Sequence, residues 1–149
     1  MKVSAKGEYA YRAVYELACN HGDAGETVIQ LEQIARNQGI PKKYLVQILL
    51  QLKRAGLVGT LRGVKGGYFL RKPPSQITLG EVLELIEGPF VPVSRGGGGQ
   101  GERTNDVLLG VIGPVLDEVR SMIHEILYDL SFEEICRRAQ LPKEQMYYI

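Results

Sequence analysis

Apolar residues recur at helical spacing in three stretches near the start of the chain. A first helix is predicted from a cap at Ser4 to about His21, with its apolar face at positions 10, 13, 14, 17 and 18. A second covers about Gln30 to Gln38, and a third runs from Pro41, at its first helical position, to a stop at Gly56. Helix, glycine turn and helix is the order typical of a helix-turn-helix.

A cationic hairpin is predicted directly after these helices. Two short apolar strands flank the turn Arg62–Gly67, whose glycines permit the positive φ that a hairpin needs. A further short strand is predicted at Thr27–Ile29. A helix-turn-helix followed by such a hairpin has the layout of a winged helix-turn-helix, which points to DNA.

The pattern changes beyond residue 74. Thr78 and Glu81 match a capping box for a short helix, Gly88–Arg103 is a glycine-rich linker with two prolines, and Ser131 opens a last short helix. The predicted organisation is a DNA-binding region at 1–74, a short helix and loop at 75–103, and a dimerisation helix with a C-terminal segment at 104–149.

A long amphipathic helix follows the linker, and Pro114 predicts that its regular part begins near Gly113. Six apolar residues spaced 4, 3, 4, 3 and 4 form a heptad-like seam, which further apolar residues such as Leu127 widen. One alternative is a core helix of the same chain. Little chain remains to cover the seam, however, which favours a homodimer. The seam consists of Leu108, Ile112, Val115, Val119, Met122 and Ile126.

Composition and charge narrow the function. No apolar run approaches the roughly 20 residues that span a bilayer, and the first residues lack the apolar stretch of a signal peptide, so we expect a cytoplasmic protein without a membrane partner. The net charge of +1 hides a division: residues 1–74 hold 12 Lys/Arg against 5 Asp/Glu, and residues 75–149 hold 6 against 12. The first half is thus suited to a polyanion, with solubilising charge as the alternative.

Candidate DNA contacts lie on the third helix and the hairpin. The first turn of that helix would face the major groove, where lysines reach phosphates or guanine and Gln47 can pair with adenine. Tyr44 either buttresses the helix or contacts a phosphate. At the hairpin, arginine suits a narrow minor groove. Exposed charge without a DNA role is the alternative for each cation. The predicted set is Lys42, Lys43, Tyr44, Gln47, Lys53, Arg54, Arg62 and Lys65.

Nothing in the chain indicates catalysis or a metal site. The glycine-rich turn lacks the spacing of a phosphate loop, and His21 and His124 lie far apart. Cys19 is predicted to be a small buried hydrophobic residue, and Cys136 either has a structural role or, beside two arginines, a lowered pKa. The two cysteines lie on unrelated helical segments and form no spaced set, so we expect a reduced protein.

Several segments together resemble the IscR/NsrR/CymR family of bacterial winged-helix regulators. They are Lys2–Ala10, Leu52–Val58, the wing pattern Arg62-Gly63…Gly66-Gly67-Tyr68, Ile77–Val82 and Leu130–Ile135. The resemblance implies a mainly α fold with a small β-wing and a long dimerisation helix. It also implies a homodimer that binds a pseudo-palindromic promoter site on double-stranded DNA, most simply as a repressor.

The chain departs from this family where many members hold an iron–sulfur cluster on three cysteines. The segment Gly88–Gly113 has neither Cys nor His, and Glu8, at a position where some members supply a further ligand, cannot hold a cluster alone. We therefore expect no cofactor, and a signal that arrives through a small-molecule effector or a partner protein. Val46 stands where some relatives carry a base-reading Glu, so the operator is not carried over. The alternative function is a winged-helix protein-interaction or chromosome-associated module.

Overall fold

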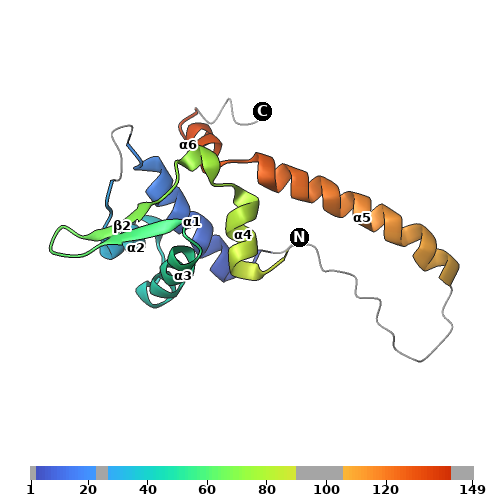
Figure 1. The fold of residues 1–149 in the computed structure, drawn as a ribbon, viewed down its shortest axis with the longest axis horizontal. Helices are drawn as coiled ribbons and strands as arrows, with labels where there is room; N and C mark the ends of the chain where they lie inside the picture. Colours follow the sequence, from blue (N-terminus) through green and yellow to red (C-terminus); the bar gives the residue numbers. More distant parts are fainter. Residues whose placement is uncertain (1–2, 23–26, 90–105, 142–149) are drawn as a thin grey trace.

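The computed structural model describes residues 3–22, 27–89 and 106–141. Three helices come first: α1 (Ala5–Cys19), α2 (Leu31–Gln38) and α3 (Lys42–Arg54). The hairpin consists of β1 (Val58–Leu61) and β2 (Gly67–Leu70). A 3-10 turn, η1 (Pro74–Gln76), then leads to α4 (Leu79–Glu87), α5 (Asp106–Asp129) and α6 (Phe132–Ala139) (Figure 1). Among the described helices, none has the length and apolarity needed to cross a membrane.

Side-chain caps set the starts of three helices, as the sequence predicts. The hydroxyl of Ser4 accepts a hydrogen bond from the backbone N–H of Gly7, and Thr78 and Ser131 accept in the same way from residues 81 and 134. Each bond satisfies one of the N–H groups that a helix start leaves free. The prediction for Pro41 is wrong by one position: its ψ of 128° is not helical, so it precedes α3 instead of beginning it.

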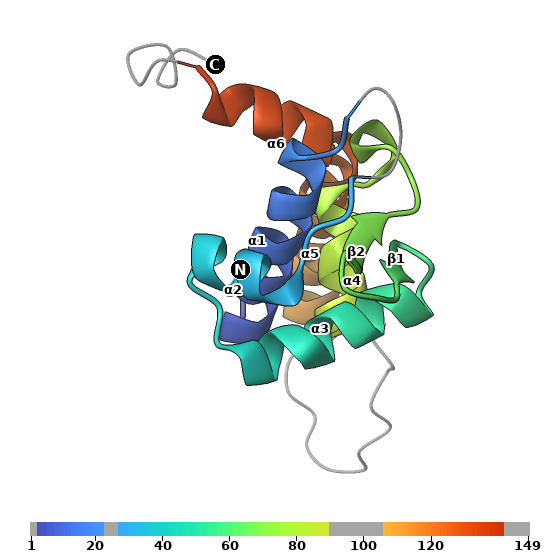
Figure 2. The same ribbon diagram turned by 90° about the vertical axis from the view of Figure 1, so that its left-hand side faces the viewer.

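One hydrophobic core holds the first three helices, the hairpin, α4 and α6 together. α1 lies at its centre and contacts each of the other five helical or strand elements that surround it: α2, α3, α4, α6 and β2 (Figure 2). The predicted apolar face of α1 is buried, and so is one apolar face of α3, which consists of Leu45, Ile48, Leu49 and Leu52. Because these side chains point inward, the opposite face of α3 is left to solvent.

The hairpin is antiparallel, with Val58 opposite Leu70. The predicted strand at 27–29 is reduced to one residue pair, in which Ile29 and Tyr68 exchange two backbone hydrogen bonds of 2.8 Å. Positive φ in the turn is confirmed at Gly63, with φ 114°. Gly66 has a different role, because a Cβ there would lie 2.2 Å from the carbonyl oxygen of Leu61.

Helix α5 is longer than predicted and projects away from the body, on the side opposite to the hairpin (Figure 1). It begins at Asp106 and continues through Pro114, so the prediction of a start near Gly113 is wrong. Proline removes the hydrogen bond to the carbonyl four residues earlier. Both Gly110 and Pro114 are exposed, so water can hydrate the carbonyl that this leaves free.

The chain returns to the core after α5. Leu79 donates its N–H to the carbonyl of Leu130, and Phe132 donates to that of Ile77, each at 2.9 Å. The Phe132 side chain is fully buried in the core that α1 organises. Leu127, predicted beside the seam of α5, is also buried, and there the prediction is wrong. The division of the chain at residues 74 and 103 stays a prediction.

Candidate nucleic-acid interface

The exposed face of α3 and the hairpin lie side by side and form the candidate DNA-binding surface (Figure 2). Burial of Leu45 and Ile48 turns Lys43, Val46 and Gln47 toward solvent on α3. The turn between α2 and α3 is closed by Gly39 in the left-handed conformation, with φ 62°. This geometry presents the first turns of α3 as a recognition helix would be presented.

Two of the predicted DNA contacts make bonds within the chain. Lys42 Nζ lies 3.3 Å from Glu32 Oε1, and both side chains are largely exposed. The pKa of Glu32 is lowered, first by a hydrogen bond from its own backbone N–H and next by Lys42. Lys53 Nζ donates to Thr60 Oγ1 at 2.8 Å, which joins the end of α3 to β1. Lys53 therefore braces the hairpin against α3.

Four other predicted cations are exposed: Lys43, Arg54, Arg62 and Lys65. None of them lies within 4 Å of a carboxylate that belongs to the described part of the chain. Exposed lysine and arginine side chains of this kind are the groups that most often contact DNA phosphates.

The tip of the hairpin carries a residue that the sequence analysis missed. Val64 is 96% exposed between Gly63 and Lys65, and its carbonyl accepts a hydrogen bond of 3.3 Å from Gln30 Nε2. This bond connects the turn to the start of α2. The sequence does carry a signal for this residue. Val64 is apolar within an otherwise polar turn, and side chains at a hairpin tip are not expected to be buried.

Tyr44 has the buttressing role that was one of its two predicted alternatives, and its contact with a phosphate stays a prediction. Its ring lies 6.1 Å from the ring of Tyr9 on α1, yet the side chain is still 52% exposed. The two tyrosines border a hollow of about 460 Å³ between the start of α1 and α3, which Lys6 and Gln47 also line. Tyr44 thus packs against α1 while about half of the residue stays exposed to solvent.

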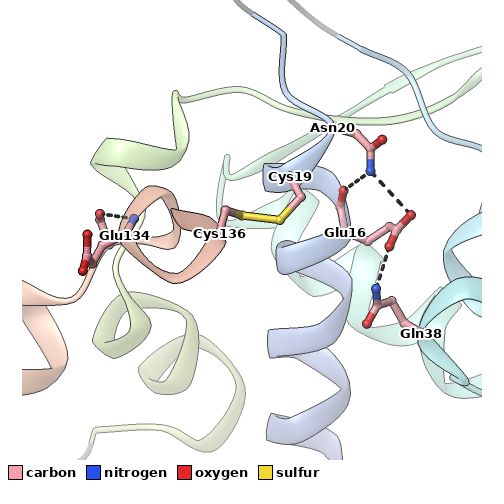
Figure 3. The surroundings of a disulfide bond; sticks show 7 residues. Glu16, Cys19, Asn20, Gln38, Glu134 and Cys136 are labelled. Atoms are coloured by element: carbon pink, nitrogen blue, oxygen red, sulfur yellow. Dashed lines mark hydrogen bonds between the residues drawn. A yellow bond between two sulfur atoms is a disulfide. The ribbon is translucent and has the colours of Figure 1, made fainter. Parts of the chain in front are cut away.

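A buried carboxylate that the sequence analysis missed positions α2 and, through it, the start of α3. Glu16 is only 7% exposed and accepts a hydrogen bond from Gln38 Nε2 at 2.6 Å (Figure 3). It also accepts one from Asn37 Nδ2 at 2.7 Å. Arg12 Nη1 donates to the backbone carbonyl of Gln38 at 3.2 Å. Because Glu16 follows Ala13 by three residues, it lies beside the apolar face of α1. A charged residue at that position was the sequence signal for a buried carboxylate.

The structure pairs the two cysteines in a disulfide between α1 and α6, with 5.7 Å between their Cα atoms (Figure 3). The expectation of reduced, unrelated thiols is therefore wrong, and so is the expectation of a buried Cys19, which is exposed. Cys136 is 8% exposed and has the structural role that was one of its two predicted alternatives. Residues 117 positions apart become neighbours here because α6 packs on α1.

The joint between α4 and α5 depends on close packing. Tyr128 donates its hydroxyl to Glu84 Oε2 at 2.5 Å and stacks on His124, with 4.3 Å between ring centroids. The hydrogen bond to Glu84, followed by burial, raises the pKa of Tyr128 to about 12. A Cβ on Gly80 of α4 would lie 2.5 Å from the Tyr128 ring. The small residue thus permits the contact that sets the direction of α5.

Beyond this joint, α5 exposes the predicted seam. Five seam residues, Ile112, Val115, Val119, Met122 and Ile126, are exposed, and Val111 and Leu116 beside them are exposed too. The side chain of the sixth, Leu108, lies outside the described residues. A row of exposed apolar side chains along one helix is typical of an interface with another protein.

A protein-family comparison matches residues 3–138 to the family Rrf2, described as an iron-dependent transcriptional regulator. The donor atoms of this chain do not fit an iron–sulfur cluster. Such a cluster is held mainly by thiolates, and both cysteines of the chain are joined to each other. Within the described ranges there is also no group of three or more His, Cys, Asp or Glu side chains placed to hold a metal ion.

Solved structures and curated relatives agree on the family. The chain is similar to the structure of CymR, the global cysteine regulator of B. subtilis, with 31% identity and a TM-score of 0.76 over 92% of this chain and 97% of the other. It is also similar to the structure of T. potens IscR, with 30% identity and a TM-score of 0.73 over 99% of this chain and 97% of the other. Among curated sequences, CymR of Bacillus subtilis is 42% identical over 62% of this chain, and IscR of Cereibacter sphaeroides is 28% identical over 95% of it and 91% of the relative. The Bacillus match spans 65% of that relative, a little under two thirds. The chain belongs to the Rrf2 family of transcriptional regulators, of the CymR and IscR type.

Proposed function

We propose that this protein is a homodimeric repressor that binds a pseudo-palindromic promoter site in the cytoplasm without an iron–sulfur cluster. The observation that carries the proposal is the joint exposure of α3 and the hairpin with cations that have no carboxylate partner among the described residues. The excess of seven positive charges in residues 1–74 supports it, because non-specific attraction to DNA is electrostatic.

The exposed seam of α5 supports the dimer. A second copy is the natural occupant, because a two-fold axis would bring identical apolar rows together. A dimer formed by two crossing α5 helices would hold two DNA-binding regions. Two-fold symmetric proteins of this kind bind palindromic half-sites that lie about one turn of DNA, or a multiple of it, apart. With no fitting cluster ligands, the signal would reach the protein through a small molecule or a partner protein.

The test of DNA binding is a fluorescence-anisotropy titration with duplexes selected from a random pool, repeated across salt concentrations. Arg62→Ala should weaken binding and reduce the salt slope by about 1 if it contacts a phosphate. Arg138→Ala is the matched control, because it removes the same charge from α6, which lies away from α3 (Figure 1). Equal affinity of Arg62→Ala and the parent protein would show that the wing is not inserted.

Dimerisation is tested by light scattering on the full chain. Val119→Glu places a charge in the exposed seam and should convert the dimer to a monomer, whereas Ser121→Glu, on the same helix outside the seam, should leave the dimer intact. A dimer that persists in Val119→Glu would locate the interface elsewhere.

The alternative, a protein-interaction or chromosome-associated module, is favoured by one observation: the apolar Val64 at the exposed hairpin tip. The same titration separates the two functions. A steep loss of affinity with salt and selection of a defined sequence support the repressor, and no binding at low salt supports the module.

A further inference from the structure

The disulfide connects the two functional parts of the molecule. Cys19 is the exposed last residue of α1, the helix around which the core is built, and Cys136 lies within α6. Only Leu130 and Ser131 separate α6 from α5, which carries the exposed apolar seam. The bond therefore restrains the dimerisation helix relative to the DNA-binding region.

A cavity gives access to this bond from solvent. It has a volume of about 530 Å³, and both cysteines line it together with His21, Arg137, Pro73 and Gln140. Its size falls within the roughly 300–1,000 Å³ of typical small-molecule sites. The two sulfur-bearing residues differ in exposure, because Cys19 is exposed whereas Cys136 is 8% exposed. An incoming small molecule therefore meets Cys19 first.

We propose that Cys19 and Cys136 form an exchange site for low-molecular-weight thiols, whose redox state sets the coupling between α5 and the DNA-binding region. Where thiol buffers keep a compartment reducing, disulfides are usually transient or redox-sensing rather than permanent staples. The effect on DNA rests on the proposed function, whereas the exchange chemistry does not.

The reaction follows ordinary thiol–disulfide exchange. The thiolate of a small thiol attacks Sγ of Cys19, the bond to Cys136 breaks, and its electron pair leaves on Cys136 Sγ, which takes a proton from water. A second small thiolate then attacks the small-molecule sulfur of the mixed disulfide and releases Cys19. Two small thiols are oxidised to one small disulfide, and the protein disulfide is reduced to two thiols.

Reduction should loosen the restraint and leave α6 folded in place. Phe132 remains fully buried, and its N–H bond to Ile77 does not involve the cysteines. The same end of α1 also holds α2, because the Glu16 carboxylate accepts a hydrogen bond from Gln38 of α2 (Figure 3). Asn20 Nδ2, next to Cys19, donates to the Glu16 backbone carbonyl at 2.8 Å. A change at Cys19 therefore occurs one residue from a contact that positions the helix preceding α3.

The exchange is tested on the full chain with mixtures of reduced and oxidised glutathione, acid quenching, alkylation with N-ethylmaleimide and intact mass analysis. In the parent protein we expect the disulfide to open and re-form reversibly as the ratio of reduced to oxidised glutathione changes. In Cys136→Ser we expect a glutathione adduct on Cys19. In Cys19→Ser, the adduct on the buried Cys136 should form at least about tenfold more slowly. Equal rates in the two variants, or no pairing in oxidised glutathione, would overturn the proposal. Circular dichroism establishes that each variant is folded.

A second measurement addresses the coupling. The affinity of the oxidised and reduced parent for a selected duplex should differ by about fivefold or more, the usual lower range of coupling between sites. The double variant Cys19→Ser/Cys136→Ser should bind with one affinity under both conditions. Equal affinity of the two parent forms would overturn the coupling. If neither form binds any duplex, the proposed function fails, and the exchange site is judged by mass analysis alone.

Discussion

Phe132 anchors the C-terminal part of the chain, and its replacement by alanine should be costly. The side chain has no exposed surface, lies 6.4 Å from the ring of Tyr11 between centroids, and starts α6 with an N–H bond to Ile77. Tyr11 is itself partly buried, and burial, followed by the charge of Glu87, raises its pKa to about 12. The ring of Phe132 therefore belongs to the core that it shares with α1 and with Ile77.

The size of the effect follows from the burial. Phe→Ala at a fully buried site lowers the free energy of unfolding by about 3–5 kcal/mol, because transfer energy is lost and a cavity remains. The upper part of that range applies here, since the disulfide holds α6 against α1 and restricts collapse of the cavity. A domain of this size is stable by about 5–15 kcal/mol, so the variant loses a large share of its stability.

The assay is urea denaturation followed by circular dichroism in the oxidised protein. Phe132→Ala should shift the midpoint with an unchanged slope, which indicates a change in stability and not in the surface exposed on unfolding. Glu133→Ala is the control, because that exposed neighbour on the same helix should change stability by no more than about 0.5 kcal/mol. A loss below about 1 kcal/mol in Phe132→Ala would refute the anchoring role.

Three further predictions concern stability. Glu16→Ala removes a buried carboxylate that accepts two hydrogen bonds from amides of α2 and should lower the free energy of unfolding by about 1–3 kcal/mol in the same urea assay. Gly80→Ala gains about 1 kcal/mol of helix propensity, but a Cβ 2.5 Å from Tyr128 costs about 1–3 kcal/mol, so a lower melting temperature is expected and a higher one would contradict the packing. Arg137 and then Arg138 lower the pKa of Glu134 from 4.5 to about 2. The stabilisation from Glu134 is therefore present above pH 4.5 and lost as the pH falls toward 2, so melting temperatures of the parent and Glu134→Gln should converge over that interval.

The part of the candidate site that depends on the spacing of apolar and polar residues in the sequence was predictable. Exposure of Lys43, Arg62 and Lys65 follows from helical periodicity on α3 and from a turn that cannot be buried. The intramolecular partners of Lys42 and Lys53 were not predictable, because Glu32 and Thr60 come near only when α2 and β1 pack against α3. Contact of any of these residues with DNA remains a prediction.

The sequence by itself determined the features that depend on a few neighbouring residues. Capping at Ser4, Thr78 and Ser131, the apolar faces of α1 and α3, and positive φ at Gly63 are local, and local geometry decides them.

Only the tertiary structure decided which distant residues meet. The return of α6 onto α1 pairs Cys19 with Cys136, the crossing of α1 and α2 surrounds Glu16 with amides, and the close approach of α4 buries the end of α5 at Leu127. These contacts arise because separate apolar faces must share one core, and hydrophobic attraction specifies that faces come together without specifying which ones.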